Sequence, residues 1–74
     1  MGNKQWGKYY QILVKGHLES YWSQWFNGMM IEQLSGGDTT LSGYVIDQAA
    51  LHGLLAKIRD LGLTLVSVRC LDES

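Results

Sequence analysis

The side chains that could do chemistry are few, and the most suggestive ones share one flank of a predicted helix. Gln48, His52 and Arg59 are spaced by four and seven positions within residues 47–62, which places them on one side of a helix. An amide, an imidazole and a guanidinium could hold a small polar metabolite or a partner. No Asp or Glu is spaced to orient His52 as a general base, so the flank is a candidate contact for a ligand or partner. The alternative is that His52 is a half-exposed polar residue at the border of the core.

The remaining reactive groups stand apart from one another. His17 lies near Lys15 in a predicted strand, and the single cysteine, Cys70, follows Arg69 near the C-terminus. Nucleophilic use of this thiol would need a neighbouring base and an oxyanion hole, and the pattern shows neither. No Cys/His cluster has zinc spacing. We therefore predict a protein that is not an enzyme, with no catalytic residue, no metal site and no cofactor.

Composition narrows the classes of partner. Six basic and seven acidic residues nearly cancel, and no Lys/Arg run is present to attract a phosphate backbone, so nucleic acid is not favoured. No apolar run approaches the roughly 20 residues of a membrane span. The first residues lack the apolar core of a signal peptide, so we expect no membrane and a cytoplasmic location.

The chain of 74 residues is short, and because it has neither disulfide nor zinc, self-association is the remaining way to stabilise it.

The element that organises the chain is an amphipathic helix predicted over residues 47–62. Asp47 can cap its N-terminus, and Gly62 can end it in a left-handed conformation. The apolar residues between them recur at spacings of three and four, so one stripe must be buried. That stripe consists of Leu51, Leu54, Leu55, Ile58 and Leu61.

We expect the rest of the chain to form the surface against which this stripe packs. Residues 9–18 alternate between apolar and polar side chains as a strand does, with Gly16 as a bend. Residues 20–28 predict a short helix whose aromatic side chains Trp22, Trp25 and Phe26 belong to the core. Residues 29–34 and 39–46 flank a glycine-containing turn and predict a hairpin, with Gly43 leaving room for an aromatic ring from the short helix. Residues 63–71 predict a last strand.

This order of elements predicts an α+β fold of the ferredoxin-like βαββαβ type. Right-handed crossovers would place two helices on one face of a four-stranded antiparallel sheet. Residues 1–8 are expected to be a flexible lead-in, residues 9–71 a single domain, and residues 72–74 a solvated tail.

The sheet face without helices is the strongest functional signal in this scheme. It mixes apolar residues with Gln11, Lys15, Ser42 and Arg69, and an apolar patch of this kind usually marks an interface. The candidate interface residues are Tyr9, Leu13, Met30, Leu34, Tyr44 and Leu65.

Residues 15–69 resemble a family of small bacterial proteins of unknown function. The resemblance lies in a W-x-x-W-F-x-G segment from Trp22 to Gly28, a T-x-L-x-G strand from Thr39, a D-Q-A-A-L-H-G-L-L helix from Asp47 and a final L-x-S-V strand. It covers most of the chain and implies no activity.

Two hypotheses of function remain open. The first is a non-enzymatic homodimer that works as a protein-interaction or regulatory module through its sheet. The alternative is a dimer that senses a small molecule near the flank formed by Gln48, His52 and Arg59.

Overall fold

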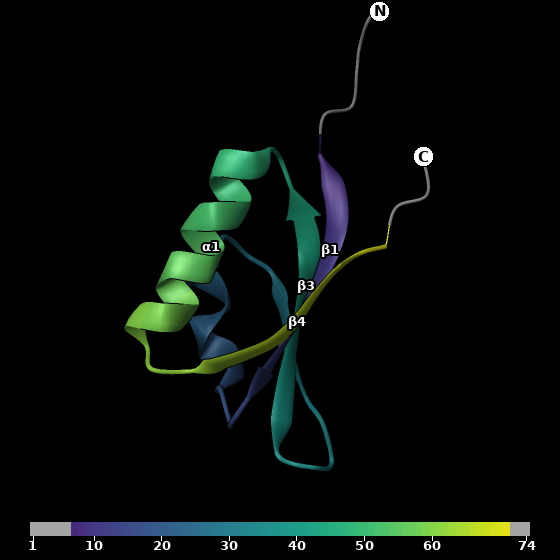
Figure 1. Cartoon of the computed structure of the whole chain (residues 1–74). Coiled ribbons are helices and arrows are strands. Elements are labelled where there is room, and N and C mark those ends of the chain that lie inside the picture. The colour runs from purple at the N-terminus through teal and green to yellow at the C-terminus, as the bar shows by residue number, and fades with distance from the viewer. Residues whose placement is uncertain (1–6, 72–74) are drawn as a thin grey trace, which may run out of the picture.

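Within residues 7–71, one antiparallel sheet carries a single α-helix on one side (Figure 1). The structure, a computed structural model, describes residues 7–71. Its elements are β1 (Lys8–Lys15), the 3-10 helix η1 (Ser20–Gln24), β2 (Met30–Gln33), β3 (Asp38–Val45), α1 (Gln48–Asp60) and β4 (Thr64–Cys70). The strand order is β2-β3-β1-β4, and every neighbouring pair is antiparallel. In Figure 1, α1 lies on one side of the sheet, and within residues 7–71 no helix covers the other side.

Helix α1 begins and ends as its sequence predicts. The Asp47 carboxylate accepts a hydrogen bond of 2.8 Å from the Ala50 N–H, which satisfies a free donor of the first turn. At the other end, the N–H of Gly62 donates to the Arg59 carbonyl and the N–H of Leu63 donates to the Ile58 carbonyl. With Gly62 at φ 79°, this is a Schellman motif.

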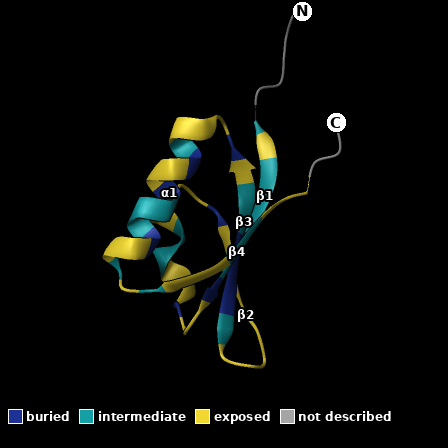
Figure 2. Cartoon of the chain, viewed as in Figure 1, coloured by how far each residue is buried: buried dark blue, intermediate teal, exposed yellow. Residues whose placement is uncertain are grey.

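The core lies between α1 and the two central strands, β1 and β3. Its buried side chains come from alternate positions of the strands and from the leucine stripe of the helix, and Figure 2 shows this inner side of α1 facing the buried part of the sheet. Leu51, Leu54 and Ile58 are the buried residues of α1. The strands contribute Ile12, Val14, Leu41 and Val45.

The prediction of a two-helix ferredoxin-like fold is wrong, because α1 is the only α-helix within residues 7–71. The four antiparallel strands are present, but the expected first helix is a 3-10 helix of five residues. No side chain caps its start, and a segment of this length gains too few hydrogen bonds to form a stable α-helix. Asn27 at φ 59° and Gly28 at φ 79° then turn the chain into β2.

The aromatic segment is also less buried than predicted. Phe26 is fully buried and Trp22 packs against the core, but Trp25 is 44% exposed. Lys57 of α1 lies over the Trp25 ring, 5.3 Å from its centroid, and donates a hydrogen bond of 2.8 Å to the Trp25 carbonyl. Trp25 therefore joins the segment to α1 at the surface and is not a core residue.

The ends of the chain fall largely outside the described residues. The predicted lead-in, residues 1–8, overlaps them only at Gly7 and Lys8, and Lys8 already belongs to β1. The predicted tail, residues 72–74, lies outside them. Within residues 7–71, no helix has the length and apolar character needed to cross a membrane.

Candidate functional site

The candidate site is the open face, which we define as the side of the sheet turned away from α1. Pairing between strands fixes which side chains stand there, since directly opposed residues share a face. On β1 and β3 the facing pairs of the open face are Tyr9–Tyr44, Gln11–Ser42, Leu13–Thr40 and Lys15–Asp38. The neighbouring pairs, such as Ile12–Leu41, point to the core. This confirms the alternation predicted for residues 9–18 and shows the same alternation in β3.

One end of the open face carries an aromatic cluster, formed by Tyr9, Tyr44, Met30 and Leu71. The rings of Tyr9 and Tyr44 meet edge to face, with centroids 5.0 Å apart, an arrangement that aromatic pairs prefer. Tyr44 is nevertheless 70% exposed, and Met30, which pairs with Ser42 on the next strand, is 64% exposed. Leu71 stands beside Tyr9, to whose carbonyl its N–H donates. Tyr44 and Met30 are thus the part of the cluster that the described chain leaves exposed.

Beyond this cluster the open face becomes polar and then charged. Leu13 lies in the middle, half-buried between Thr40 on β3 and Ser67 on β4. The last facing pair joins a cation to an anion, Lys15 and Asp38. The prediction of a continuous apolar patch is therefore too simple, because polar residues separate Leu13 from the aromatic cluster.

Two predicted interface residues are placed differently from the rest. Leu34 continues the alternation of Met30 and Glu32 on the open face, but it stands in the turn after β2, where its N–H donates to the Asp38 carbonyl. Leu65 was predicted on the open face, and this is wrong. It pairs with the core residue Val14, and so belongs to the side that faces α1.

A bulge causes the error at Leu65. The pairing of β1 with β4 shifts between Leu13 and Val14, so that β4 carries one extra residue, Val66, between Leu65 and Ser67. An extra residue reverses the alternation on one side of it. Strict alternation along β4 therefore misplaces the residues before Val66.

The predicted helix flank is present, but its three polar residues are divided between two hollows. His52 and Arg59 line a shallow hollow of about 300 Å³ with Leu55 and Ala56. Gln48 instead lines a second hollow of about 240 Å³, between the start of β1 and the start of α1.

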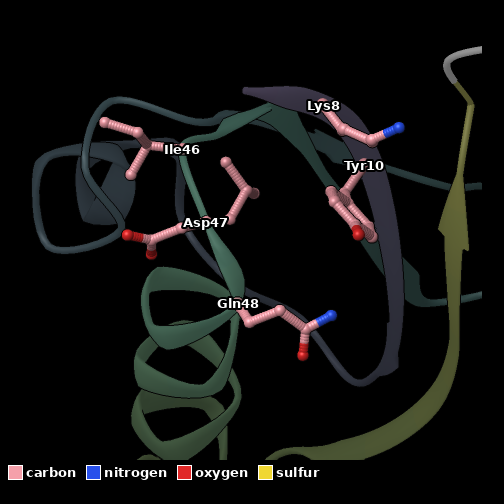
Figure 3. Close-up of a pocket in the computed structure, with 6 residues that line it drawn as sticks. Lys8, Tyr10, Ile46, Asp47 and Gln48 are labelled. Atoms are coloured by element: carbon pink, nitrogen blue, oxygen red, sulfur yellow. The ribbon is translucent and has the colours of Figure 1, made fainter. Parts of the chain in front are cut away.

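Figure 3 shows the second hollow. There the Gln48 amide and the Tyr10 ring extend into the space between the two elements, and the Lys8 side chain lies at its edge. Ile46, also a lining residue, extends away from Tyr10 in this view. The space is open, and its polar side chains come from different elements.

The other candidate groups are exposed. His17 contacts Glu19 across 2.7 Å, and Arg59 lies 3.6 Å from Asp60, with all four side chains largely in solvent. Cys70 is an exposed free thiol. Within the described part of the chain, no three His, Cys, Asp or Glu side chains come together as metal ligands would.

Sequence reasoning missed two features of the open face. One is Leu71, which continues the pairing of β4 with β1 beyond Cys70. The other is the facing pair Lys15–Asp38. The second depends on the register between β1 and β3, which the alternation of β1 and the predicted hairpin do not give.

Comparison with known proteins gives one family and no annotated relative. Searches of curated proteins and of solved structures find no match for this chain. Residues 9–69 match the model of a domain of unknown function, DUF8691. This match spans β1 to β4 almost completely and includes every strand of the open face. The chain therefore belongs to the family of the domain of unknown function DUF8691.

Proposed function

We propose that this protein is a non-enzymatic interaction module that acts as a homodimer, with the open face of the sheet as the contact surface. The observation that carries the proposal is the exposed aromatic cluster. Tyr44 and Met30 leave most of their apolar surface in water, on a face that no described helix covers. Burying apolar area stabilises a complex by about 25 cal/mol per Å² before the costs of association are subtracted.

A second copy of the chain is the occupant that the face fits best. The two central strands have eight residues each, and four strands spaced about 4.8 Å apart give a face of roughly 19 Å by 27 Å. Two such faces can pack as a β-sandwich, with side chains from both sheets interdigitating. A single self-complementary patch also closes on itself in a dimer and leaves no free copy to propagate.

The cytoplasm is part of the same proposal. The one cysteine of the chain, Cys70, is an exposed free thiol. Reducing compartments preserve such thiols, whereas oxidising ones favour disulfides.

Sedimentation of the wild type and of two variants tests the proposal. We expect a dimer for the wild type and a monomer, or a much weaker dimer, for Leu13→Glu, which places a charge in the middle of the open face. Because Leu13 is half-buried, Tyr44→Glu serves as a second variant at a position that is 70% exposed. The Tyr44→Glu variant should fold like the wild type, as checked by circular dichroism.

The matched control is Tyr21→Glu. Tyr21 is 74% exposed and belongs to η1, so the same change of side chain occurs away from the open face. This variant should sediment like the wild type. A wild type that is monomeric at every concentration, or a dimer that persists in folded Tyr44→Glu, contradicts the proposal.

A second candidate function is the binding of a small polar metabolite at the helix flank. It is supported by the hollow that His52 and Arg59 share; Gln48 lines a separate hollow. A thermal-shift screen with metabolites tests it, since a ligand that binds only the folded state raises the melting temperature. The shift should disappear in His52→Ala, and a screen without any shift removes this candidate.

A further inference from the structure

The two central strands present complementary residues to each other along the whole open face. Tyr9 faces Tyr44 at one end and Lys15 faces Asp38 at the other. Between them, Gln11 faces Ser42, and Leu13 faces Thr40. Three of these four pairs join groups that also make favourable contacts between separate chains: ring with ring, amide with hydroxyl, and cation with anion.

This pattern constrains how a second copy can lie on the face. Consider a two-fold axis that runs between β1 and β3, parallel to them and above the open face. Rotation about it places the partner's β3 over β1, with the same residues at the same end. Each residue of β1 then faces the partner's copy of its own neighbour on β3. Aligned sandwiches of this kind, with strands about 30° apart, are a common way for two sheets to pack.

The charges distinguish this axis from a two-fold axis that runs across the strands above the same face. With the axis along the strands, Lys15 lies over the partner's Asp38, and Asp38 over the partner's Lys15. With the axis across the strands, the charged end of one sheet covers the aromatic cluster of the other. Charges would then be removed from water without a partner, which is strongly unfavourable.

Lys15 and Asp38 have no ion-pair partner within residues 7–71, which also favours the axis parallel to the strands. Within residues 7–71, neither Lys15 nor Asp38 takes part in a salt bridge, although the two stand opposite each other. Lys15 is exposed and Asp38 is partly exposed. Both side chains are therefore available to a second chain, and the long lysine side chain can follow the angle between the two sheets.

The outer strands fit this arrangement as well. The same rotation places β4 over the partner's β2. Arg69 on β4 pairs with Gln11, and Glu32 on β2 pairs with Thr40. Thr40 belongs to the facing pair next to that of Gln11, so Arg69 and Glu32 lie only one facing pair apart along the strand direction. Arg69 and the partner's Glu32 would then approach at the rim, where opposite charges favour the correct register.

We propose that the homodimer has its two-fold axis parallel to the strands, between β1 and β3, and that Lys15 pairs with the partner's Asp38. The inference rests on the proposed function and adds the geometry and the specificity of the contact. It makes dimerisation selective, because a chain with the wrong charge at either position is repelled.

Charge reversal tests this geometry. Lys15→Glu alone places two like-charged contacts in the dimer, as does Asp38→Lys alone, and each variant should self-associate at least about tenfold more weakly than the wild type. When equal amounts of the two variants are mixed, every contact between the chains regains opposite charges. Native mass spectrometry should then show the heterodimer well above the statistical half of all dimers.

The mixture separates contacts between chains from contacts within a chain. Each variant keeps like charges at positions 15 and 38 of its own chain, so a gain on mixing can come only from the partner. The double variant Lys15→Glu with Asp38→Lys is the matched control, since it restores opposite charges both within and between chains. It should recover the self-association of the wild type.

The outcomes distinguish this inference from the proposed function. If the wild type dimerises and Tyr44→Glu abolishes the dimer, but the mixture stays statistical, the axis is wrong while the open face remains the interface. If the wild type is a monomer at every concentration, both are wrong.

Discussion

Met29 packs directly over Gly43, so that a Cβ added at this glycine would lie 3.1 Å from the Met29 Cγ. Gly43 stands opposite Tyr10 on the side of β3 that faces the core, and Met29 is buried. The sequence predicted that this glycine leaves room for an aromatic ring from the short helix. The room is instead filled by the residue that follows the turn at Gly28.

Gly43→Val should therefore destabilise the protein, although valine favours strands. The Cβ of valine alone would crowd the Met29 side chain, and overpacking of this kind typically costs about 1–3 kcal/mol of unfolding free energy. Urea unfolding at fixed protein concentration measures the change. An unchanged midpoint would mean that Met29 can move aside without loss.

Gly53→Ala is the matched opposite change and should stabilise the protein by up to about 1 kcal/mol. Gly53 lies in the middle of α1, it is exposed, and nothing lies within 4 Å of a Cβ built there. If Gly43→Val and Gly53→Ala change the unfolding free energy by the same amount, contact with Met29 does not determine the effect at Gly43.

The parts of the fold that the sequence predicts best are those whose signals are local. The cap at Asp47, the stop at Gly62 and the alternation of β1 all depend on neighbours in the chain, and the structure confirms them. The type of the first helix and the face of Leu65 were not predictable in this way. A 3-10 helix results from a short connection without a cap, and the bulge beside Leu65 results from pairing with a distant strand.

In the candidate site, too, local features were predictable from the sequence and features that depend on distant strands were not. Alternation was enough to put Tyr9 and Leu13 on the open face. The separation of Leu13 from the aromatic cluster and the pairing of Lys15 with Asp38 depend on the register between β1 and β3. Register is set by packing and turn geometry over the whole sheet, so no single stretch of sequence contains it.

Phe26→Ala should destabilise the protein far more than Trp25→Ala. Phe26 is fully buried, and truncating such a ring costs about 3–5 kcal/mol, which is enough to unfold a domain of this size. Trp25 is 44% exposed, and its ring is partly covered by Lys57. Thermal unfolding followed by circular dichroism compares the two, and a larger loss for Trp25→Ala would contradict the burial described above.

Asp47→Ala should cost about 1 kcal/mol of unfolding free energy, because the Ala50 N–H loses its acceptor. Asp47→Asn keeps an acceptor oxygen in the same place and is the matched control. Its stability should stay closer to that of the wild type. If both substitutions cost the same, the charge of Asp47 matters more than its hydrogen bond.

Thr39→Val tests the buried hydrogen bonds that join the bend after β1 to the hairpin. Thr39 is fully buried, its hydroxyl donates to the Gly16 carbonyl at 2.6 Å, and it lies 3.1 Å from the Gln33 Oε1. Gln33 in turn donates from its Nε2 to the Leu18 carbonyl. Valine keeps the volume of threonine but leaves the Gly16 carbonyl without this donor, so we expect a loss of about 1–3 kcal/mol.

The control for this change is Thr64→Val, at an exposed position on the edge strand β4, where valine should be nearly neutral. Amide hydrogen exchange adds a local measurement, since losing the bond to Gly16 should speed exchange in the bend and in β2 more than in α1. If Thr39→Val is as stable as the wild type and exchange is unchanged, the bend is held by the packing of Leu18 in the core and not by these hydrogen bonds.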